Sequence, residues 1–171
     1  MQERPDAGVA GPGVRAAVRA AGPWDADALA DLHAASWREA YHGLLPAEVI
    51  ASETAKMPAQ WQRRLLDPGN AAYWVAEHDG RLIGFSWAEA LGPGAARPLE
   101  LVGLYVLARY HGSGVADDLL ICAVGEAPCQ LWVAEGNERA IAFYRRHRFE
   151  HDGTFRQMPE WGGITIQRMV R

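Results

Sequence analysis

The pattern of hydrophobic and polar positions predicts a largely helical first half. Residues 14–20 alternate loosely and stop before a Gly-Pro pair, which predicts one strand at the start. Asp25 then has the chemistry of a helix N-cap, and apolar residues recur at helical spacing until Gly43. Pro46 predicts the start of another short helix. A further helix follows, with an apolar stripe at four-residue spacing formed by Met57, Trp61 and Leu65.

The second half of the chain is rich in β-prone residues. Residues 73–77 and 82–88 flank Asp79-Gly80, a dipeptide typical of tight hairpin turns. After a loop that contains Gly and Pro, four further strands are predicted at residues 100–106, 131–133, 149–156 and 163–170. Helices that begin at Val115 and after Asn137 separate the first three of these strands. This order of elements predicts a mixed α/β (α+β) sheet of about seven strands.

The chain is long enough for one domain with a hydrophobic core. It has 171 residues, of which 49% are hydrophobic and 22% are charged, an ordinary composition for a globular protein. Residues 1–12 are rich in Gly, Pro and Ala without periodicity, so we expect a flexible N-terminal tail. No repeat or long linker divides the remainder, and we expect residues 13–171 to form a single domain.

Charge and targeting signals argue against several classes of protein. The formal net charge is -4, so we expect no nucleic-acid partner. The first residues carry no apolar signal core, and no window approaches the roughly 18 uninterrupted apolar residues of a membrane span. We therefore expect a cytoplasmic protein without a membrane partner. His147 and His151 lack a frame of carboxylates or cysteines, so we expect no metal site. Cys122 and Cys129 are expected to be free and at least partly buried thiols.

One stretch, residues 104–116, has the sequence of a phosphate-binding loop. A β-prone run passes into the turn Gly112-Ser113-Gly114, and a helix pattern starts at Val115. Glycine lets backbone amides approach an anion, and a helix N-terminus adds unpaired donors and the positive end of a dipole. The chain's single lysine is Lys56, so the loop lacks the lysine of a Walker motif. Asp117 stands where a dinucleotide fingerprint has its third glycine.

The glycine loop is the first of four segments that together resemble the GNAT family of acetyl-CoA-dependent N-acetyltransferases. The family has Gln/Arg-x-x-Gly-x-Gly/Ala at this place. Its three defined positions are either Arg109, Gly112 and Gly114, or His111, Gly114 and Ala116. We prefer the second register because it puts the small Ala116 in the first helical turn, beside the expected pyrophosphate. This register requires His111 in place of Gln or Arg.

The other three segments lie on both sides of this loop. Residues 100–106 are similar to the family's fourth strand, and residues 36–46 to the acceptor-side helix pair of many bacterial members. Residues 131–144 are similar to the fifth strand and the helix that follows, with the family's Asn at Asn137 and its Phe-Tyr pair at the end. The resemblance implies a twisted, mostly antiparallel sheet with helices on both faces. One departure is Arg148, where glycine often ends this helix in a left-handed conformation.

The resemblance implies that acetyl-CoA is the acetyl donor. We expect its pyrophosphate on the backbone of His111, Gly112, Ser113, Gly114, Val115 and Ala116. We expect its pantetheine arm along Leu104, Tyr105 and Val106, where the fourth and fifth strands of such enzymes splay apart. Asn137, Phe143 and Tyr144 are expected to complete this site, although Asn137 is a good helix cap by itself. A strand-edge amide near Val106 is a candidate donor to the carbonyl oxygen in the transition state.

Two side chains are candidates for the proton transfers. A phenol has a pKa of about 10 against about 8.5 for a thiol, so Tyr144 stays protonated and can donate to a leaving thiolate. Simple packing beside Phe143 is the alternative. Glu100, at the start of the fourth strand, is the candidate base acting through water, and a solvated carboxylate is the alternative. The candidates for an acceptor pocket, with core packing as their alternative, are Trp37, Tyr41, Trp87 and Trp161.

The expected activity is direct transfer of acetyl from acetyl-CoA to a primary amine of a small molecule or peptide, without an acyl-enzyme. The alternative is a non-catalytic acyl-CoA-binding module that acts as a sensor or partner domain. An enzyme that accepts another acyl group is a weaker third reading. The acceptor stays open among polyamines, aminoglycoside-like amines, amino acids and peptide N-termini. A homodimer is common for this fold, so the oligomeric state stays open as well.

Overall fold

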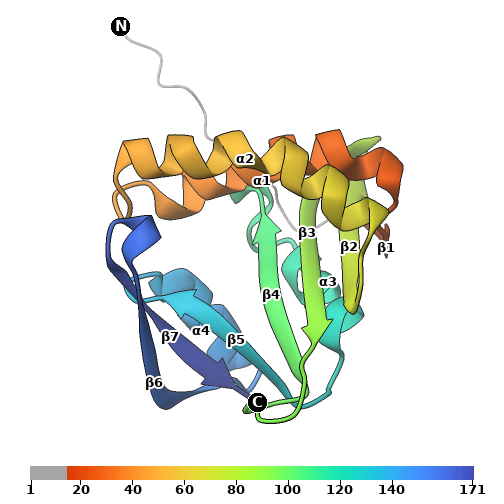
Figure 1. Cartoon of the computed structure of the whole chain (residues 1–171). Helices are drawn as coiled ribbons and strands as arrows, with labels where there is room; N and C mark the ends of the chain where they lie inside the picture. The colour runs from red at the N-terminus through yellow and green to blue at the C-terminus, as the bar shows by residue number, and fades with distance from the viewer. Residues whose placement is uncertain (1–14) are drawn as a thin grey trace, which may run out of the picture.

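The computed structural model describes residues 15–171, which form a twisted seven-stranded sheet with helices on both faces (Figure 1). The strands are β1 (Ala17–Ala20), β2 (Ala71–His78), β3 (Arg81–Ala90), β4 (Leu99–Val106), β5 (Cys129–Ala134), β6 (Glu150–Met158) and β7 (Ile164–Val170). The helices are α1 (Ala26–Tyr41), α2 (Ala47–Leu66), α3 (Val115–Val124) and α4 (Glu138–Arg146). The tail expected at residues 1–12, and the start of the strand expected at 14–20, lie outside the described residues.

The sheet is mostly antiparallel, which confirms the expected fold class. Its strand order is β1-β2-β3-β4-β5-β7-β6, and β4 with β5 forms its parallel pair. That pair extends only from Leu99–Leu101 on β4 to Cys129–Leu131 on β5. Beyond these residues the two strands diverge (Figure 1), and the rest of β4 has no strand partner on its β5 side. The splay expected from the family resemblance is therefore present.

The two faces of the sheet carry different helices. The helices α1 and α2 cover one face, where their buried residues pack with Val75 of β2 and Phe85 of β3. On the other face α3 packs against β1 to β4, and α4 shares a core with β4, β5 and β7. Neighbouring residues alternate between these cores, as a strand requires: Tyr105 packs on the α1–α2 face and Val106 on the α3 face.

A β-bulge in β4 changes which residues face α1 and α2. Gly103 lies opposite Trp87 and Leu101 opposite Ala88, so Val102 is an extra residue in β4. A Cβ atom on Gly103 would come within 2.1 Å of the Trp87 ring, so glycine is required for Trp87 to lie across the strand. Because of the extra residue, Leu101 faces α3 and α4 although Tyr105 faces α1.

The prediction of two helices near Pro46 and Met57 is wrong, because α2 is continuous over this region. Pro58 lies inside α2, where a proline costs about 3 kcal/mol. The apolar stripe continues on both sides of it, and Met57 and Trp61 are 2% and 0% exposed. Burying two such side chains contributes roughly 3–6 kcal/mol, which offsets the missing hydrogen bond.

Asp25 and Cys122 differ from their expected roles, whereas Arg148 adopts the conformation that a glycine usually has. Asp25 makes no N-cap bond; its carboxylate instead accepts two hydrogen bonds of 2.8 Å from Arg19 and one of 2.8 Å from the Gly22 amide. Cys122, expected to be at least partly buried, lies on the exposed side of α3. Arg148 has a φ of 65°, so α4 ends in the usual left-handed residue without a glycine.

Candidate functional site

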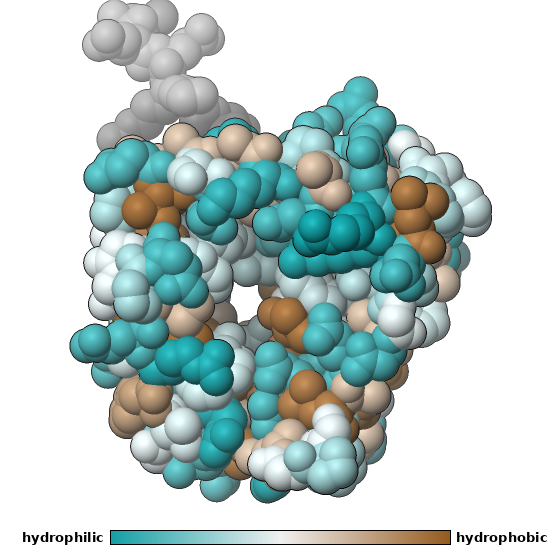
Figure 2. Space-filling model, in the orientation of Figure 1, coloured by the Kyte–Doolittle hydropathy of each residue, from teal (hydrophilic) through white to brown (hydrophobic). Residues whose placement is uncertain are grey.

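Most of the predicted site residues surround one cavity of about 520 Å³ beside the unpaired part of β4. The space-filling view shows an opening at the place where Figure 1 draws the gap between β4 and β5 (Figure 2). The predicted residues that line the cavity are Leu104, Tyr105, Val106, His111, Gly112, Gly114, Ala116, Asn137, Phe143 and Tyr144. Ser113 and Val115 do not line it: the Val115 side chain is buried between α3 and the sheet, and the Ser113 hydroxyl donates to the Tyr110 carbonyl.

The glycine loop presents unused backbone donors to this cavity. The amides of Gly112, Gly114, Val115 and Ala116 donate to no oxygen among residues 15–171, whereas those of His111 and Ser113 close local turns. Gly112 and Gly114 have φ values of 78° and 89°, which a side chain would strain. The helix α3 begins at Val115, so its dipole adds to the field of these amides. The arrangement is an anion cradle.

The free edge of β4 supplies further backbone donors. The Leu107 amide donates to the Ile83 carbonyl of β3. Successive residues of a strand direct their amides to opposite sides, so the Val106 amide is directed away from β3, toward the gap. In agreement, the Val106 carbonyl accepts a hydrogen bond from His111 rather than from β3. A ligand in the cavity therefore meets strand-edge groups at Val106 and, two residues earlier, at Leu104.

His111 and Arg139 form a pair at the rim of the cavity. His111 Nε2 lies 2.9 Å from the Val106 carbonyl oxygen, which requires a proton on Nε2, and the guanidinium of Arg139 contacts the same ring. Burial and the nearby charge of Arg139 lower the pKa of His111, so the ring is neutral at pH 7. Arg139 is exposed and has no carboxylate within ion-pair distance among the described residues. It therefore presents a free positive charge beside the anion cradle.

Sequence reasoning missed Arg139 as a site residue. Its position, two residues after the N-cap Asn137, puts it in the first turn of α4. This turn faces the glycine loop across the gap, a relation between two distant segments that no local pattern reveals. One signal in the sequence could have revealed it. His111 stands where the loop motif has Gln or Arg, which suggests that a residue of another segment supplies the positive charge.

The negative charge of Asp117 is neutralised inside the same cavity. Its carboxylate lies 3.0 Å from Arg146 and 2.8 Å from His147, both from the end of α4. Burial opposes ionisation of this carboxyl, but these two hydrogen bonds hold its pKa below the usual value. The residue that replaces a third glycine thus ties α3 to α4, and its charge is compensated beside the cradle.

Three residues of α4 and its cap line the cavity as expected. Asn137 accepts a hydrogen bond from the Ala140 amide at 3.3 Å, so it caps α4 and faces the cavity at once. Tyr144 is 8% exposed, and its ring contacts Phe143 edge to face. Burial raises the pKa of the Tyr144 phenol well above its ordinary value. Its hydroxyl therefore keeps its proton at neutral pH.

The other predicted side chains do not line this cavity. Trp37, Tyr41 and Trp87 are at most 8% exposed and belong to the core under α1 and α2. Trp37 and Tyr41 lie on the side of α1 that faces the sheet, and Trp87 lies on the side of β3 that faces α1 and α2, which explains their burial. Trp161 is partly buried and packs against Trp37 with ring centroids 5.2 Å apart.

Glu100 lies in the part of β4 that still pairs with β5. Its carboxylate accepts a hydrogen bond of 2.7 Å from Gln130, its neighbour across the parallel pair. It alternates with Leu101, so it faces the α1–α2 side of the sheet. The carboxylate is thus at the point where β4 and β5 begin to diverge, on the face opposite α3 and α4.

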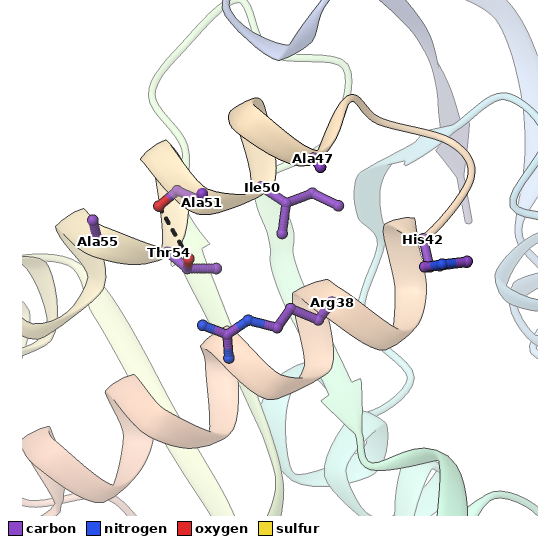
Figure 3. Close-up of a pocket in the computed structure, with 7 residues that line it drawn as sticks. All are labelled: Arg38, His42, Ala47, Ile50, Ala51, Thr54 and Ala55. Carbon is purple, nitrogen blue, oxygen red and sulfur yellow. Dashed lines mark hydrogen bonds between the residues drawn. The ribbon is translucent and has the colours of Figure 1, made fainter.

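A second pocket lies between α1 and α2, and few of its side chains carry reactive or charged groups (Figure 3). Its volume is about 560 Å³, and three of its seven lining residues are alanines of α2. The Thr54 hydroxyl already donates to the Ala51 carbonyl at 3.2 Å. Elsewhere among residues 15–171, no three His, Cys, Asp or Glu side chains gather as a metal site requires. No helix in that range is long and apolar enough to cross a membrane.

Comparison with known proteins gives matches over most of the chain. The model of the Acetyltransferase (GNAT) family matches residues 27–149. A probable N-acetyltransferase of Mycobacterium tuberculosis is 31% identical over 152 residues, which cover 83% of this chain and 84% of that protein. An uncharacterized N-acetyltransferase of Mycobacterium bovis is 35% identical over 138 residues, which cover 76% of this chain and 86% of the relative.

Solved structures share the fold. The PaiA N-acetyltransferase from Thermoplasma acidophilum, crystallised in complex with coenzyme A, matches with a TM-score of 0.74 and 22% identity. The match covers 90% of this chain and 98% of that one. The solution structure of apo YjaB from Escherichia coli matches with a TM-score of 0.67 and 21% identity, over 91% of this chain and 97% of the other.

Proposed function

Because the chain belongs to the GNAT acetyltransferase family, we propose that it transfers acetyl from acetyl-CoA directly to a primary amine of a small molecule or peptide. The observation that carries the proposal is the set of three unused amides, those of Gly112, Gly114 and Ala116, in the same cavity as the free edge of β4 and Tyr144. An anion cradle, a strand edge and a buried proton donor match the three parts of an acetyl-CoA molecule: pyrophosphate, pantetheine amides and thioester.

The residues around the cavity fit this donor chemically. The free amides of Gly112, Gly114 and Ala116 and the charge of Arg139 suit a pyrophosphate. The strand edge from Leu104 to Val106 suits the amides of an extended arm, because it offers backbone groups that no strand uses. A thioester at the end of the arm supplies the activated acetyl group.

The chain's own residues then perform two tasks during transfer. The Val106 amide donates to the carbonyl oxygen, whose negative charge grows as the amine nitrogen bonds to the carbonyl carbon. Tyr144 donates a hydrogen bond, and then its proton, to the sulfur as the carbon–sulfur bond breaks. Burial raises the pKa of the Tyr144 phenol, which by itself opposes proton donation, but the same burial raises the proton affinity of a thiolate beside it, so the two effects offset each other.

Glu100 is proposed as the base that takes the amine proton through a water molecule. A lysine-like amine has a pKa of about 10.4, so it is mostly protonated at neutral pH. We expect Glu100→Gln to lower kcat/KM at pH 7 about tenfold and to move the rising limb of the pH–rate profile to higher pH. The control is Glu89→Gln, which removes the carboxylate directly opposite on β3. A profile of Glu100→Gln that overlays the wild type would exclude this role.

Arg139 is proposed as a ligand for a phosphate of the donor. Loss of a charge-assisted hydrogen bond costs about 1.5–3 kcal/mol, so Arg139→Gln is expected to weaken acetyl-CoA binding at least tenfold. Calorimetric titration with acetyl-CoA measures this effect directly. Arg145→Gln is the matched control, because Arg145 is exposed on the same helix but does not line the cavity. Equal dissociation constants for the two variants would remove Arg139 from the site.

Binding and turnover, measured together, separate an enzyme from a non-catalytic module. The full chain is titrated with acetyl-CoA by calorimetry and then assayed for release of the CoA thiol in the presence of a panel of amines. An enzyme binds acetyl-CoA and releases thiol with at least one amine. Tight binding without release for any amine favours the sensor module, and absence of binding contradicts both proposals.

A further inference from the structure

Unpaired polar atoms gather on the α1–α2 face of the sheet. Four buried atoms of α1 and α2 have no hydrogen-bond partner among the described residues: His33 Nε2, Ser36 Oγ, Trp37 Nε1 and Arg64 Nη1. Buried polar groups are nearly always paired, so such a group on a functional face indicates a missing partner. None of these four side chains has a role in the proton transfers proposed above.

Two of these groups connect the cavity to the end of α2 through aromatic rings. His33 lies 5.1 Å from Tyr105, which lines the cavity, and 5.8 Å from both Trp61 and Trp87, measured between ring centroids. The Arg64 guanidinium in turn lies 5.5 Å from the Trp61 ring and 5.4 Å from the Trp87 ring. A continuous set of contacts therefore runs from the donor cavity to a partly buried arginine.

The unpaired groups at this end are hydrogen-bond donors. The Trp61 indole donates to His33 Nδ1 at 3.2 Å, so the proton of the neutral ring is on Nε2. Arg64 has only donors, and no described carboxylate lies within ion-pair distance of it, although the charge of Glu89 acts on it from farther away. Two donor groups, one of them cationic, suit an anion that accepts several hydrogen bonds, as a carboxylate does.

Hydrogen-bond acceptors, rather than donors, lie where β4 and β5 begin to diverge, on the same face of the sheet. Glu100 carries a negative charge there, and the Oε1 atom of its partner Gln130 is buried without a donor. The hydrogen-bond acceptors of Glu100 and Gln130 suit an ammonium group, and the donors of Arg64 suit a carboxylate. Together they match a molecule that carries both groups.

We propose that Arg64 binds a carboxylate of the acceptor, so that the acceptor is an amine that also carries a carboxylate, as an amino acid does. This inference rests on the proposed acetyl transfer and narrows its substrate. Glu100 and Gln130 receive the ammonium end, and Arg64, over the flat faces of Trp61 and Trp87, holds the anionic end. Polyamines lack the carboxylate and would leave Arg64 unpaired.

The test uses acceptors in matched pairs that differ only in this charge. Amino acids are assayed for thiol release beside the corresponding amino-acid amides and the decarboxylated amines. For at least one amino acid, the wild-type chain is expected to prefer the carboxylate form at least tenfold in kcat/KM. Arg64→Gln is expected to abolish this preference by raising KM for the amino acid, with kcat and the KM for acetyl-CoA unchanged. Arg64→Lys keeps the charge and is expected to restore part of the preference.

Two controls separate recognition from stability. Arg63→Gln changes the neighbouring exposed arginine of α2 and should keep the wild-type preference. Thermal melting of each variant identifies any that fails to fold, in which case Arg64→Lys provides the comparison. Equal rates for amino acids and their amides, or a preference for polyamines, would overturn the inference while the proposed transfer stands. No thiol release with any amine would instead contradict the proposed transfer itself.

Discussion

Tyr144→Phe is expected to lower kcat at least tenfold while the affinity for acetyl-CoA stays unchanged. The substitution removes one hydroxyl and keeps the ring, which contacts Phe143 and Phe149 in the core behind the cavity. The aromatic packing and the anion cradle are therefore preserved. The proton that the leaving thiolate needs must then come from water, which the buried position of Tyr144 keeps distant.

Turnover is measured under saturating acetyl-CoA, and affinity by calorimetry. Tyr110→Phe is the matched control, because it removes another tyrosine hydroxyl from the lining of the same cavity. We expect near wild-type turnover for this control. Unchanged turnover of Tyr144→Phe would show that Tyr144 is a core aromatic and would move the proton donor elsewhere.

Folding stability is expected to fall by about 2 kcal/mol between pH 7.5 and pH 5 because of His33. Burial and the charge of Arg64 lower the pKa of His33 to about 3 in the folded chain, against about 6.5 in the unfolded chain. The unfolded state therefore binds the proton first as the pH falls, and stability decreases below pH 6.5. The lowered pKa of His111 acts in the same direction.

Urea unfolding at the two pH values measures this loss. His33→Gln keeps an acceptor for the Trp61 indole but cannot titrate, so most of the pH dependence should disappear in this variant. His42→Gln, at an exposed position, should keep it. Carboxylates such as Asp117, whose pKa is lowered, lose their contribution only below about pH 4, outside this window. If His33→Gln lost as much stability between pH 7.5 and pH 5 as the wild type does, His33 would not be the cause of the pH dependence.

Local patterns predicted those elements whose cause is local. Asp79 and Gly80 both have positive φ values, as a two-residue hairpin turn requires, so the dipeptide was a reliable signal. The helix α3 starts at Val115, so Ala116 lies in its first turn and lines the cavity, as the register from His111 requires. Gly112 and Gly114 of the other register line the cavity as well, so the register stays a prediction. The mostly antiparallel sheet and the splay of β4 from β5 were implied by the family resemblance rather than by periodicity.

The features that sequence reasoning missed depend on contacts between distant segments. Pro58 suggests a helix end by itself, but the buried stripe across it belongs to a core with α1 and the sheet. The bulge at Val102 and the requirement for glycine at Gly103 depend on β3, because the Trp87 ring lies where a Cβ atom on Gly103 would be. The approach of Arg139 to His111 joins two segments that are 28 residues apart. In each case the cause is a tertiary neighbour that no local window contains.

The most direct test of the proposed transfer is a two-substrate assay with isotopically labelled acetyl-CoA. Initial rates are measured while acetyl-CoA and an acceptor amine are varied, and the product is analysed by mass spectrometry. The proposed transfer predicts that the labelled acetyl group appears on the amine and that the double-reciprocal lines intersect, as a ternary complex requires. Parallel lines with label on the protein, or no labelled amine from any acceptor, would contradict direct transfer in this cavity.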